Sequence, residues 1–370
     1  MSDKTLDFAI RAFLTWLFRR RHPEVVILKI AITALATTVL SLVVGADVIL
    51  KWVQLNIEVG SLDTYGKLAA GLLMVVVSIC MLIAYIRFQN EQKRLNRQRT
   101  IIIEGRGLRD DLGESLSSVA SQLGKGIQIP IILDLRQKVN ETIVSPEATL
   151  PRIAAMREAL NQHKAAHNAD DLTVVYGGLA PVPLTVLSGV EVDDEGAIEV
   201  VDWDREKEAW RALDVADDGK RFSIEGMNSV KNARRVVVAV SVSYPISSAD
   251  LQTTFNMPIV RLELEGGSAS SHWSGEKQAA LALQFLELVK ALSGQGVEEI
   301  HLVLAAPNSV SFNLGRRYDR RNLPNLFVYQ YERSRSIKYP WSVRIPVIGQ
   351  APEIVHTTAG SDGFAVEETP

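Results

Sequence analysis

The chain has 370 residues, of which 47% are hydrophobic and 22% are charged, enough for a buried core and more than one domain. Residues 1–99 carry 13 Lys and Arg against 7 Asp and Glu, whereas residues 100–370 carry 27 against 36. The acidic C-terminal part argues against a general duplex-DNA binder, which would need a basic face, but leaves room for a small anionic ligand in a local pocket. Because Cys80 is the single cysteine, no disulfide can form within one chain and no oxidising compartment is required.

Two apolar runs in the N-terminal third predict transmembrane helices. A spanning helix needs about 20 apolar residues, and the runs at 30–50 and 68–86 both reach that length. We therefore expect spans over residues 25–50 and 67–88, joined by a short external loop over 51–66. The alternative is a pair of buried helices in a soluble domain, but such helices rarely lack charge over so long a stretch.

Basic residues flank both predicted spans and predict their orientation. Arg19 to Arg21 precede the first span, and a basic linker over residues 89–100 follows the second. The positive-inside rule then places both termini in the cytoplasm. Polar residues recur every fourth position within residues 1–24, which predicts an interfacial amphipathic helix, or alternatively a helix packed on the protein itself.

After the linker, strand-like and helix-like segments alternate, which implies parallel βαβ units. We predict a cytosolic α/β domain over residues 101–345 in two similar halves, about 101–225 and 226–345, followed by a flexible tail over 346–370. The predicted strands lie at 99–105, 127–136, 171–178, 198–203, 234–244, 257–265, 298–307 and 325–332. The predicted helices lie at 112–123, 145–164, 179–189, 275–293 and 308–318.

Catalytic patterns are weak throughout the sequence. It contains neither the P-loop GxxxxGK[ST] nor the nucleophile elbow GxSxG. His163 and His167 are spaced as in HExxH but lack its glutamate. Asp202, Asp204 and Glu206 resemble a metal cluster, although their alternation favours a strand end and a surface turn. We therefore expect no enzyme, no metal and no cofactor.

Four turns that follow predicted strands form the candidate ligand site. Ligands of open α/β sheets bind beyond the carboxyl ends of strands, and helix N-termini favour anions there. Arginines supply forked donors for phosphate, and tyrosines can stack on a base. For each turn taken singly, the alternative is an ordinary connection. The candidates are Arg106, Tyr176, Gly177, Gly178, Ser243, Tyr244, Pro307, Asn308, Ser309, Arg316 and Arg317.

Several of these segments resemble the SAVED family. The family's C-terminal signature is resembled by three segments of this chain: HLVLAAPNSVSFNLGRR at 301–317, followed by LPNLFVYQYE and KYPWSVRIP. Upstream, VVYGGLAPVPLTVLSGVEV at 174–192 and VVVAVSVSYPIS at 236–247 resemble the family's first half and its central strand. The resemblance covers most of residues 101–345 and implies two fused CARF-like, Rossmann-type halves. With two predicted N-terminal spans, the chain resembles the two-TM type of SAVED effector.

This resemblance implies a function in bacterial anti-phage (CBASS) immunity. SAVED domains are receptors for cyclic oligonucleotides made by a CD-NTase, and we expect a cyclic trinucleotide here. Binding would drive homo-oligomerisation and disrupt the lipid bilayer of the inner membrane, in which the multi-pass chain keeps both termini cytoplasmic, leading to abortive infection. One alternative is a membrane-tethered receptor that recruits a partner without a lesion. Another is an enzyme that degrades the ligand, for which the sequence shows no general base with a plausible partner.

Overall fold

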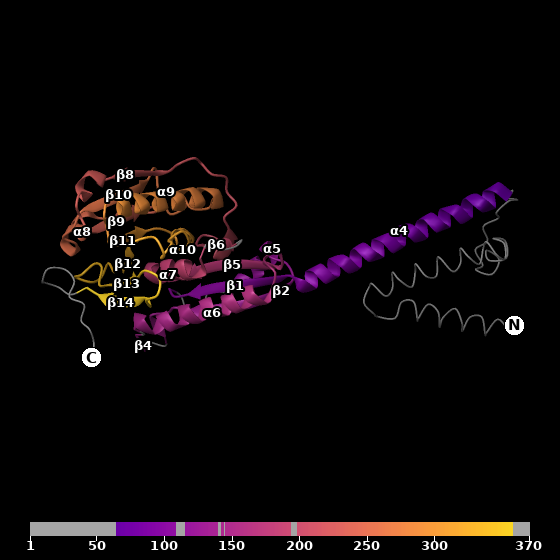
Figure 1. Cartoon of the computed structure of the whole chain (residues 1–370), viewed down its shortest axis with the longest axis horizontal. Coiled ribbons are helices and arrows are strands. Elements are labelled where there is room, and N and C mark those ends of the chain that lie inside the picture. The colour runs from indigo at the N-terminus through magenta and orange to yellow at the C-terminus, as the bar shows by residue number, and fades with distance from the viewer. Residues whose placement is uncertain (1–63, 109–114, 140–141, 144, 194–197, 358–370) are drawn as a thin grey trace. The chain divides into compact units, whose positions relative to one another are not determined.

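The computed structural model describes residues 64–108, 115–139, 142–143, 145–193 and 198–357 (Figure 1). The chain divides into two compact units, Met1–Arg97 and Gln98–Pro370. The predicted interfacial helix and first span lie outside the described residues, as does the end of the predicted tail.

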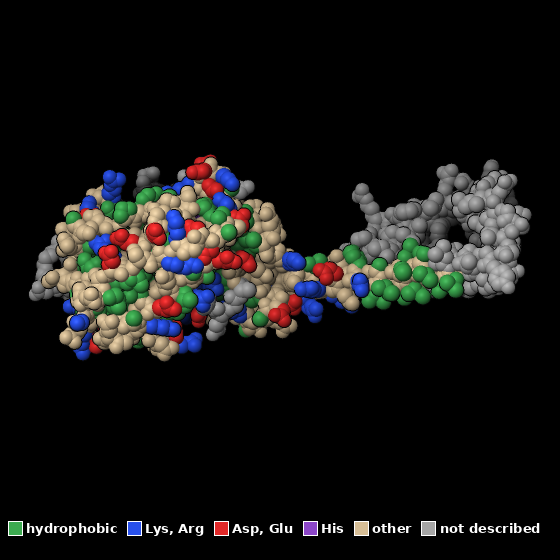
Figure 2. Space-filling model, turned by 90° about the horizontal axis from the view of Figure 1, so that it is seen from above, with side chains coloured by type: hydrophobic (Ala, Val, Ile, Leu, Met, Phe, Trp, Pro, Cys, Tyr) green, Lys and Arg blue, Asp and Glu red, His purple; other side chains and the backbone are tan. Residues whose placement is uncertain are grey.

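In the first unit, the structure describes a single helix, α4 (Thr64–Arg97). It covers the second predicted span and continues through most of the predicted linker. Among the α4 side chains that the structure describes, eight large apolar ones are exposed, and Figure 2 shows apolar side chains along one stretch of the helix and basic ones along the next. Within the described residues, no helix combines the length and apolarity needed to cross a bilayer. The exposed side chains are Leu72, Val75, Val76, Val77, Ile79, Leu82, Ile83 and Ile86.

The second unit begins with a five-stranded sheet in the order β2-β1-β5-β6-β7. Its first four strands are parallel, as the alternation of strands and helices predicts, and β7 is antiparallel. The strands are β1 (Arg99–Arg106), β2 (Ile127–Asp134), β5 (Leu172–Leu179), β6 (Ile198–Asp204) and β7 (Ala209–Ala212), with a small hairpin of β3 (Lys138–Val139) and β4 (Thr142–Ile143). The helices are α5 (Leu116–Leu123), η1 (Pro146–Thr149), α6 (Leu150–Ala166), η2 (Ala169–Asp171) and α7 (Val182–Val192).

A seven-stranded sheet follows, in the order β14-β13-β12-β11-β9-β10-β8. Its strands β12, β11, β9 and β10 are parallel, whereas β8 pairs antiparallel with β10, β13 with β12, and β14 with β13. The strands are β8 (Phe222–Glu225), β9 (Arg235–Ser241), β10 (Ile259–Leu264), β11 (Glu299–Ala305), β12 (Asn325–Gln330), β13 (Trp341–Ile345) and β14 (Glu353–His356). The helices are η3 (Met227–Val230), α8 (Ser248–Thr254), α9 (Gly275–Gly294) and α10 (Asn308–Arg316).

Two predicted boundaries differ from the structure. We predicted the division between the halves at about residue 225, whereas the chain already enters the second sheet at Phe222, where β8 begins to pair with β10. The predicted flexible tail contains β14, which pairs with β13 and places Glu353 2.6 Å from the Arg344 guanidinium. Both strands have four residues, too few for their alternation to stand out in the sequence.

A pair of helices, one from each half, joins the two sheets. α7 of the first half packs against β12 and β13 of the second, and α10 of the second half packs against β5 and β6 of the first. The two helices approach closely at Gly189 and Gly315. A Cβ at Gly189 would lie 2.2 Å from the carbonyl oxygen of Phe312, and one at Gly315 would lie 2.2 Å from that of Val186. Only glycine fits at either crossing point.

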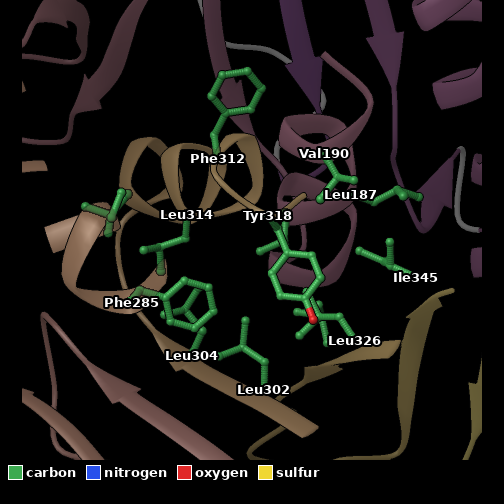
Figure 3. Close-up of a cluster of buried hydrophobic side chains, with 14 of the residues drawn as sticks. Leu187, Val190, Phe285, Leu302, Leu304, Phe312, Leu314, Tyr318, Leu326 and Ile345 are labelled. Atoms are coloured by element: carbon green, nitrogen blue, oxygen red, sulfur yellow. The ribbon is translucent and has the colours of Figure 1, made fainter. Parts of the chain in front are cut away.

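One hydrophobic core extends across this helix pair (Figure 3). Leu187 and Val190 of α7 and Leu314 of α10 lie over Leu302 of β11 and Leu326 of β12. Because a buried leucine or valine contributes about 1.5–3 kcal/mol, this shared core holds the halves together. The carboxyl ends of strands from both halves are thereby fixed relative to one another.

Candidate ligand-binding site

A cavity of about 1050 Å³ opens at the carboxyl ends of β6, β9 and β11. The first half contributes the end of β6 and its hairpin turn, residues 202–207, with Arg211 of β7. The second half contributes the turns after β9 and β11, including Ser243, Tyr244, Pro307 and Asn308. The cavity therefore lies between the halves, at the sheet edge where the sequence predicts ligand binding.

The N-terminus of α10, which we predicted as a phosphate site, already holds a carboxylate of the protein. The backbone N–H of Ser309 donates to Asp202 Oδ2 at 3.0 Å, and the Asp202 side chain is buried. This carboxylate stabilises the helix terminus electrostatically, as a bound anion would. Asp202 comes from β6, so the contact also ties the first half to the second.

Asn308 makes a second polar link between the halves. Its Oδ1 accepts from the backbone N–H of Ala180 at 3.1 Å and from the Thr185 hydroxyl at 2.9 Å. Ala180 and Thr185 are both buried, so these donors have no access to water. The Ala-Pro-Asn-Ser turn thus fixes how the two halves meet at the floor of the cavity.

Polar side chains behind this floor form a continuous network. His272 Nε2 lies 3.6 Å from Asp202 Oδ2. Gln278 Nε2 donates to the His272 carbonyl at 2.6 Å and to Ser309 Oγ at 2.9 Å, while its Oε1 accepts from Asn313 Nδ2 at 2.7 Å. Burial lowers the pKa of His272, although the neighbouring Asp202 charge opposes the shift. His272 is therefore neutral at pH 7 in the folded protein.

The β6–β7 hairpin forms a charged wall of the cavity. Asp204 Oδ1 accepts from the backbone N–H groups of Glu206 and Lys207 at 3.0 and 3.2 Å, which fixes the turn. Arg205 and Lys207 are exposed on this turn and line the cavity. Arg211 lies over the Trp273 ring at 4.7 Å, where the cation–π contact holds its guanidinium. Arg205 and Lys207 are thus cations suited to phosphate groups, whereas the Arg211 guanidinium also donates to Asp214 at 3.2 Å and lies 3.9 Å from Asp204.

Aromatic side chains from the second half also line the cavity. Tyr244 and Tyr331 are 61% and 45% exposed, so each offers a ring face to a ligand. Tyr339 is buried beside them, with its ring centroid 5.5 Å from that of Tyr331. Asp250 of α8 completes this wall. The arrangement suits a ligand that has both flat bases and anionic groups.

Some predicted residues lie outside this cavity. Arg106 Nε donates to Glu104 Oε1 at 2.7 Å. Tyr176 is fully buried and stacks on Phe312 with ring centroids 3.5 Å apart, so in this structure it has no ring face for a base. Gly177 and Gly178 are buried beside it, where a Cβ would meet Val201 or the Tyr176 hydroxyl. These three residues pack the core of the first half.

Arg316 and Arg317 line a separate, smaller cavity of about 290 Å³, together with Asn313 and Asp214. Neither arginine borders the larger cavity. Of the eleven predicted residues, Ser243, Tyr244, Pro307 and Asn308 line the larger cavity, and Ser309 is buried at its floor.

Several cavity residues were not selected from the sequence, among them Asp250, His272 and Trp273, the hairpin turn and Tyr331. The sequence pattern at Asp202 to Lys207 favours a strand end and a surface turn, and its position after a predicted strand is the signal that could have selected it. Tyr331 lies one residue beyond β12 and was treated only as part of a family motif. Among the described residues, no cluster of three or more His, Cys, Asp or Glu is arranged to hold a metal ion.

Two family models match the chain. The model for SAVED, the SMODS-associated and fused to various effectors sensor domain, matches residues 153–345, more than half of the chain. The model for Saf_2TM, the SAVED-fused 2TM effector domain, matches residues 3–150. The second match extends over β1 and β2, which share a sheet with β5 and β6.

The solved structures that resemble the chain include SAVED/CARF-domain containing receptors named Cap4. The Acinetobacter baumannii receptor with 2'3'3'-cAAA is 13% identical (TM-score 0.44), covering 82% of this chain and 65% of that chain. The same receptor with 3'3'3'-cAAA is 14% identical (TM-score 0.45), covering 82% of this chain and 66% of that chain. The Moraxella osloensis receptor is 14% identical (TM-score 0.42), covering 68% of this chain and 50% of that chain.

This chain therefore spans less than two thirds of the length of each of these receptors. Comparison with the curated proteins gives no match. Because a family model covers more than half of its residues, the chain belongs to the SAVED family of sensor domains and carries a SAVED-fused 2TM effector domain in its N-terminal part.

Proposed function

We propose that this protein is a membrane effector of bacterial anti-phage CBASS immunity, activated by a cyclic oligonucleotide from a CD-NTase. The observation that carries the proposal is the cavity between the halves, where exposed tyrosines lie together with the cations Arg205 and Lys207 of the hairpin turn. Its volume of about 1050 Å³ suits a ligand of several nucleotides, and we propose a cyclic trinucleotide. No catalytic step is part of this function.

The ligand acts by favouring one arrangement of the two halves over another. It can shift that equilibrium only by its difference in affinity for the two arrangements. A hundredfold difference supplies about 2.7 kcal/mol, enough to make a minor state comparable with the resting one. The contacts of Asn308 and Asp202 lie at the cavity floor and join the halves, so a ligand there can act directly on the contacts between them.

The output is an assembly of chains in the inner membrane. The exposed apolar side chains of α4, followed by Arg87, Lys93, Arg94 and Arg97, suit a helix that leaves the acyl region on its basic side. Both termini are cytoplasmic in this arrangement. Assembly concentrates the two-helix units, and their packing disrupts the bilayer and leads to abortive infection.

Dye release from liposomes tests the proposal. The purified full chain is reconstituted in vesicles filled with a self-quenching dye, and cyclic di-, tri- and tetranucleotides are added one at a time. We expect release with one ring and none with a linear trinucleotide. Binding of a ring without release would contradict the membrane lesion and support a tethered receptor that recruits a partner. Loss of the ring during incubation, followed by chromatography, would instead indicate an enzyme.

A further inference from the structure

Among the described residues, four carboxylates line the cavity: Glu206 lies exposed on the hairpin turn, and Asp202, Asp204 and Asp250 differ in how far the protein itself uses them. Asp202 accepts from two backbone N–H groups, those of Trp203 at 2.8 Å and Ser309 at 3.0 Å. Asp204 accepts from two N–H groups of the hairpin turn. By contrast, the only hydrogen-bond donor to the Asp250 carboxylate among the described residues is the Tyr331 hydroxyl, 3.5 Å from Oδ2, the outer limit of a hydrogen bond. Asp250 therefore keeps most of its acceptor capacity for a ligand.

Asp250 also lies where a base can stack. The contact between its carboxylate and the Tyr331 hydroxyl places Asp250 beside Tyr331, which is 45% exposed. Both residues line the cavity. The buried Tyr339 supports the Tyr331 ring from within, with 5.5 Å between their centroids. A base stacked on Tyr331 would therefore bring the polar atoms of its edge close to the carboxylate.

An ionised carboxylate only accepts hydrogen bonds, so it distinguishes bases by their donors. Adenine and cytosine each present an exocyclic amino group, and guanine presents an amino group next to a ring N–H. Uracil flanks its single ring N–H with two carbonyl oxygens, which repel a carboxylate. A subsite with a carboxylate beside a ring face therefore favours an amino-bearing base over uracil.

We propose that Asp250 and Tyr331 form a base-reading subsite, in which Tyr331 stacks on one base of the ring and Asp250 accepts from its exocyclic amino group. This inference rests on the proposed function, because it requires a cyclic oligonucleotide in the cavity. Arg205 and Lys207 on the hairpin turn bind the phosphates of the same ligand without regard to base.

Calorimetric titration of the full chain in detergent tests the subsite. The probes are three synthetic cyclic trinucleotides of one linkage that contain only adenine, only guanine or only uracil. We expect the better purine ring to bind more tightly than the uracil ring by roughly 5- to 100-fold. Asp250→Asn should lower this ratio severalfold, because an amide both donates and accepts and so tolerates uracil.

Asp170→Asn is the matched control. It removes the same charge at an exposed position just before β5, at the opposite edge of the sheet from the cavity, and should leave the ratio unchanged. Tyr331→Ala is a second variant and should weaken binding of every ring by removing the stacking face. An unchanged ratio in Asp250→Asn overturns the subsite and leaves the proposed function intact. Absence of binding by all three rings, and by cyclic di- and tetranucleotides, overturns the proposed function itself.

Discussion

The β5–α7 unit of the first half and the β11–α10 unit of the second have matching backbones. In each, a buried strand runs into an Ala-Pro turn and then a helix. The same number of residues separates Pro181 from Gly189 as separates Pro307 from Gly315. Each glycine lies against a backbone carbonyl of the other helix, at the same spacing. The two units are therefore related across the helix crossing.

Their first helical residues differ. α7 begins with Val182 and Pro183, which have no side-chain donor or acceptor, whereas α10 begins with Asn308 and Ser309. Asn308 and the Ser309 backbone bond to the first half, and the cavity opens beside them. The backbone shared by the two segments thus forms the packing between the halves, and the polar turn at Asn308 and Ser309 contributes to the ligand cavity. Mutations can test the shared part and the differing part separately.

The shared part predicts the largest effect. Gly189→Ala and Gly315→Ala should each lower the free energy of unfolding by about 3 kcal/mol, because the new Cβ would force the two helices apart. Urea unfolding of the full chain in detergent, followed by tryptophan fluorescence, measures this loss. Gly294→Ala is the control, because a Cβ there meets nothing within 4 Å. Strongly unequal losses at Gly189 and Gly315 would contradict the symmetry.

The differing part predicts a smaller effect. Asn308→Ala leaves the buried Ala180 N–H without its acceptor and should cost about 2 kcal/mol of unfolding free energy. Val182→Ala at the equivalent position should cost about 1 kcal/mol, since it removes only half-buried methyl groups. Asn308→Asp keeps the accepting oxygen and should be milder than Asn308→Ala. Equal losses for Asn308→Ala and Val182→Ala would show that the polar link adds nothing.

The β6–β7 hairpin, which lines the cavity together with the β11–α10 turn, is expected to affect ligand binding alone. Lys207→Ala should weaken every ring similarly and reduce the salt dependence of binding by about one unit of log–log slope, because one phosphate contact is lost. Titrations at several salt concentrations measure both quantities. Lys231→Ala removes an exposed lysine outside the cavity and should change neither. A loss confined to one base would mean that Lys207 reads bases instead of phosphates.

The pH dependence should also distinguish the halves. Both buried histidines among the described residues, His272 and His301, belong to the second half. Burial lowers the pKa of each. Below about pH 6.5 the unfolded chain binds protons that the folded chain does not, so stability is full above that pH and falls as the pH drops through it.

Hydrogen exchange at pH 5.5 and 7.5, corrected for intrinsic rates, measures this difference. Protection should fall more at low pH in β9, β11 and β12 than in β1 and β5. His301→Phe retains a flat ring against Phe327, on which His301 stacks, and should reduce the acid sensitivity of the second sheet. Equal acid sensitivity in the two sheets would contradict the assignment to these histidines.

Most of the fold could be predicted because its central strands are buried on both faces. β9, with the sequence RVVVAVS, has six consecutive buried residues and is recognisable as a strand by composition alone. The edge strands β7, β8 and β14 have four residues each, and their pairing depends on neighbours distant in sequence. Such short segments carry too little periodicity to identify before the sheet is known.

For the candidate site, the sequence predicts only that it lies at the carboxyl ends of the parallel strands. The rule of carboxyl ends selects turns but not the contacts within them. It selected Tyr176, which the helix crossing buries against Phe312, and the α10 N-terminus, where Asp202 from the other half already lies. Both outcomes depend on how the two halves pack, which no local pattern in the sequence reports.

The most direct test of the account is calorimetric binding of cyclic oligonucleotides to the full chain in detergent, with and without Arg205→Glu. Arg205 is exposed on the cavity wall, so this charge reversal places repulsion against a phosphate without disturbing the core. We predict saturable binding of a cyclic trinucleotide to the native chain and a loss of at least about tenfold in the variant. Equal affinity in the two proteins would contradict a ligand site in this cavity.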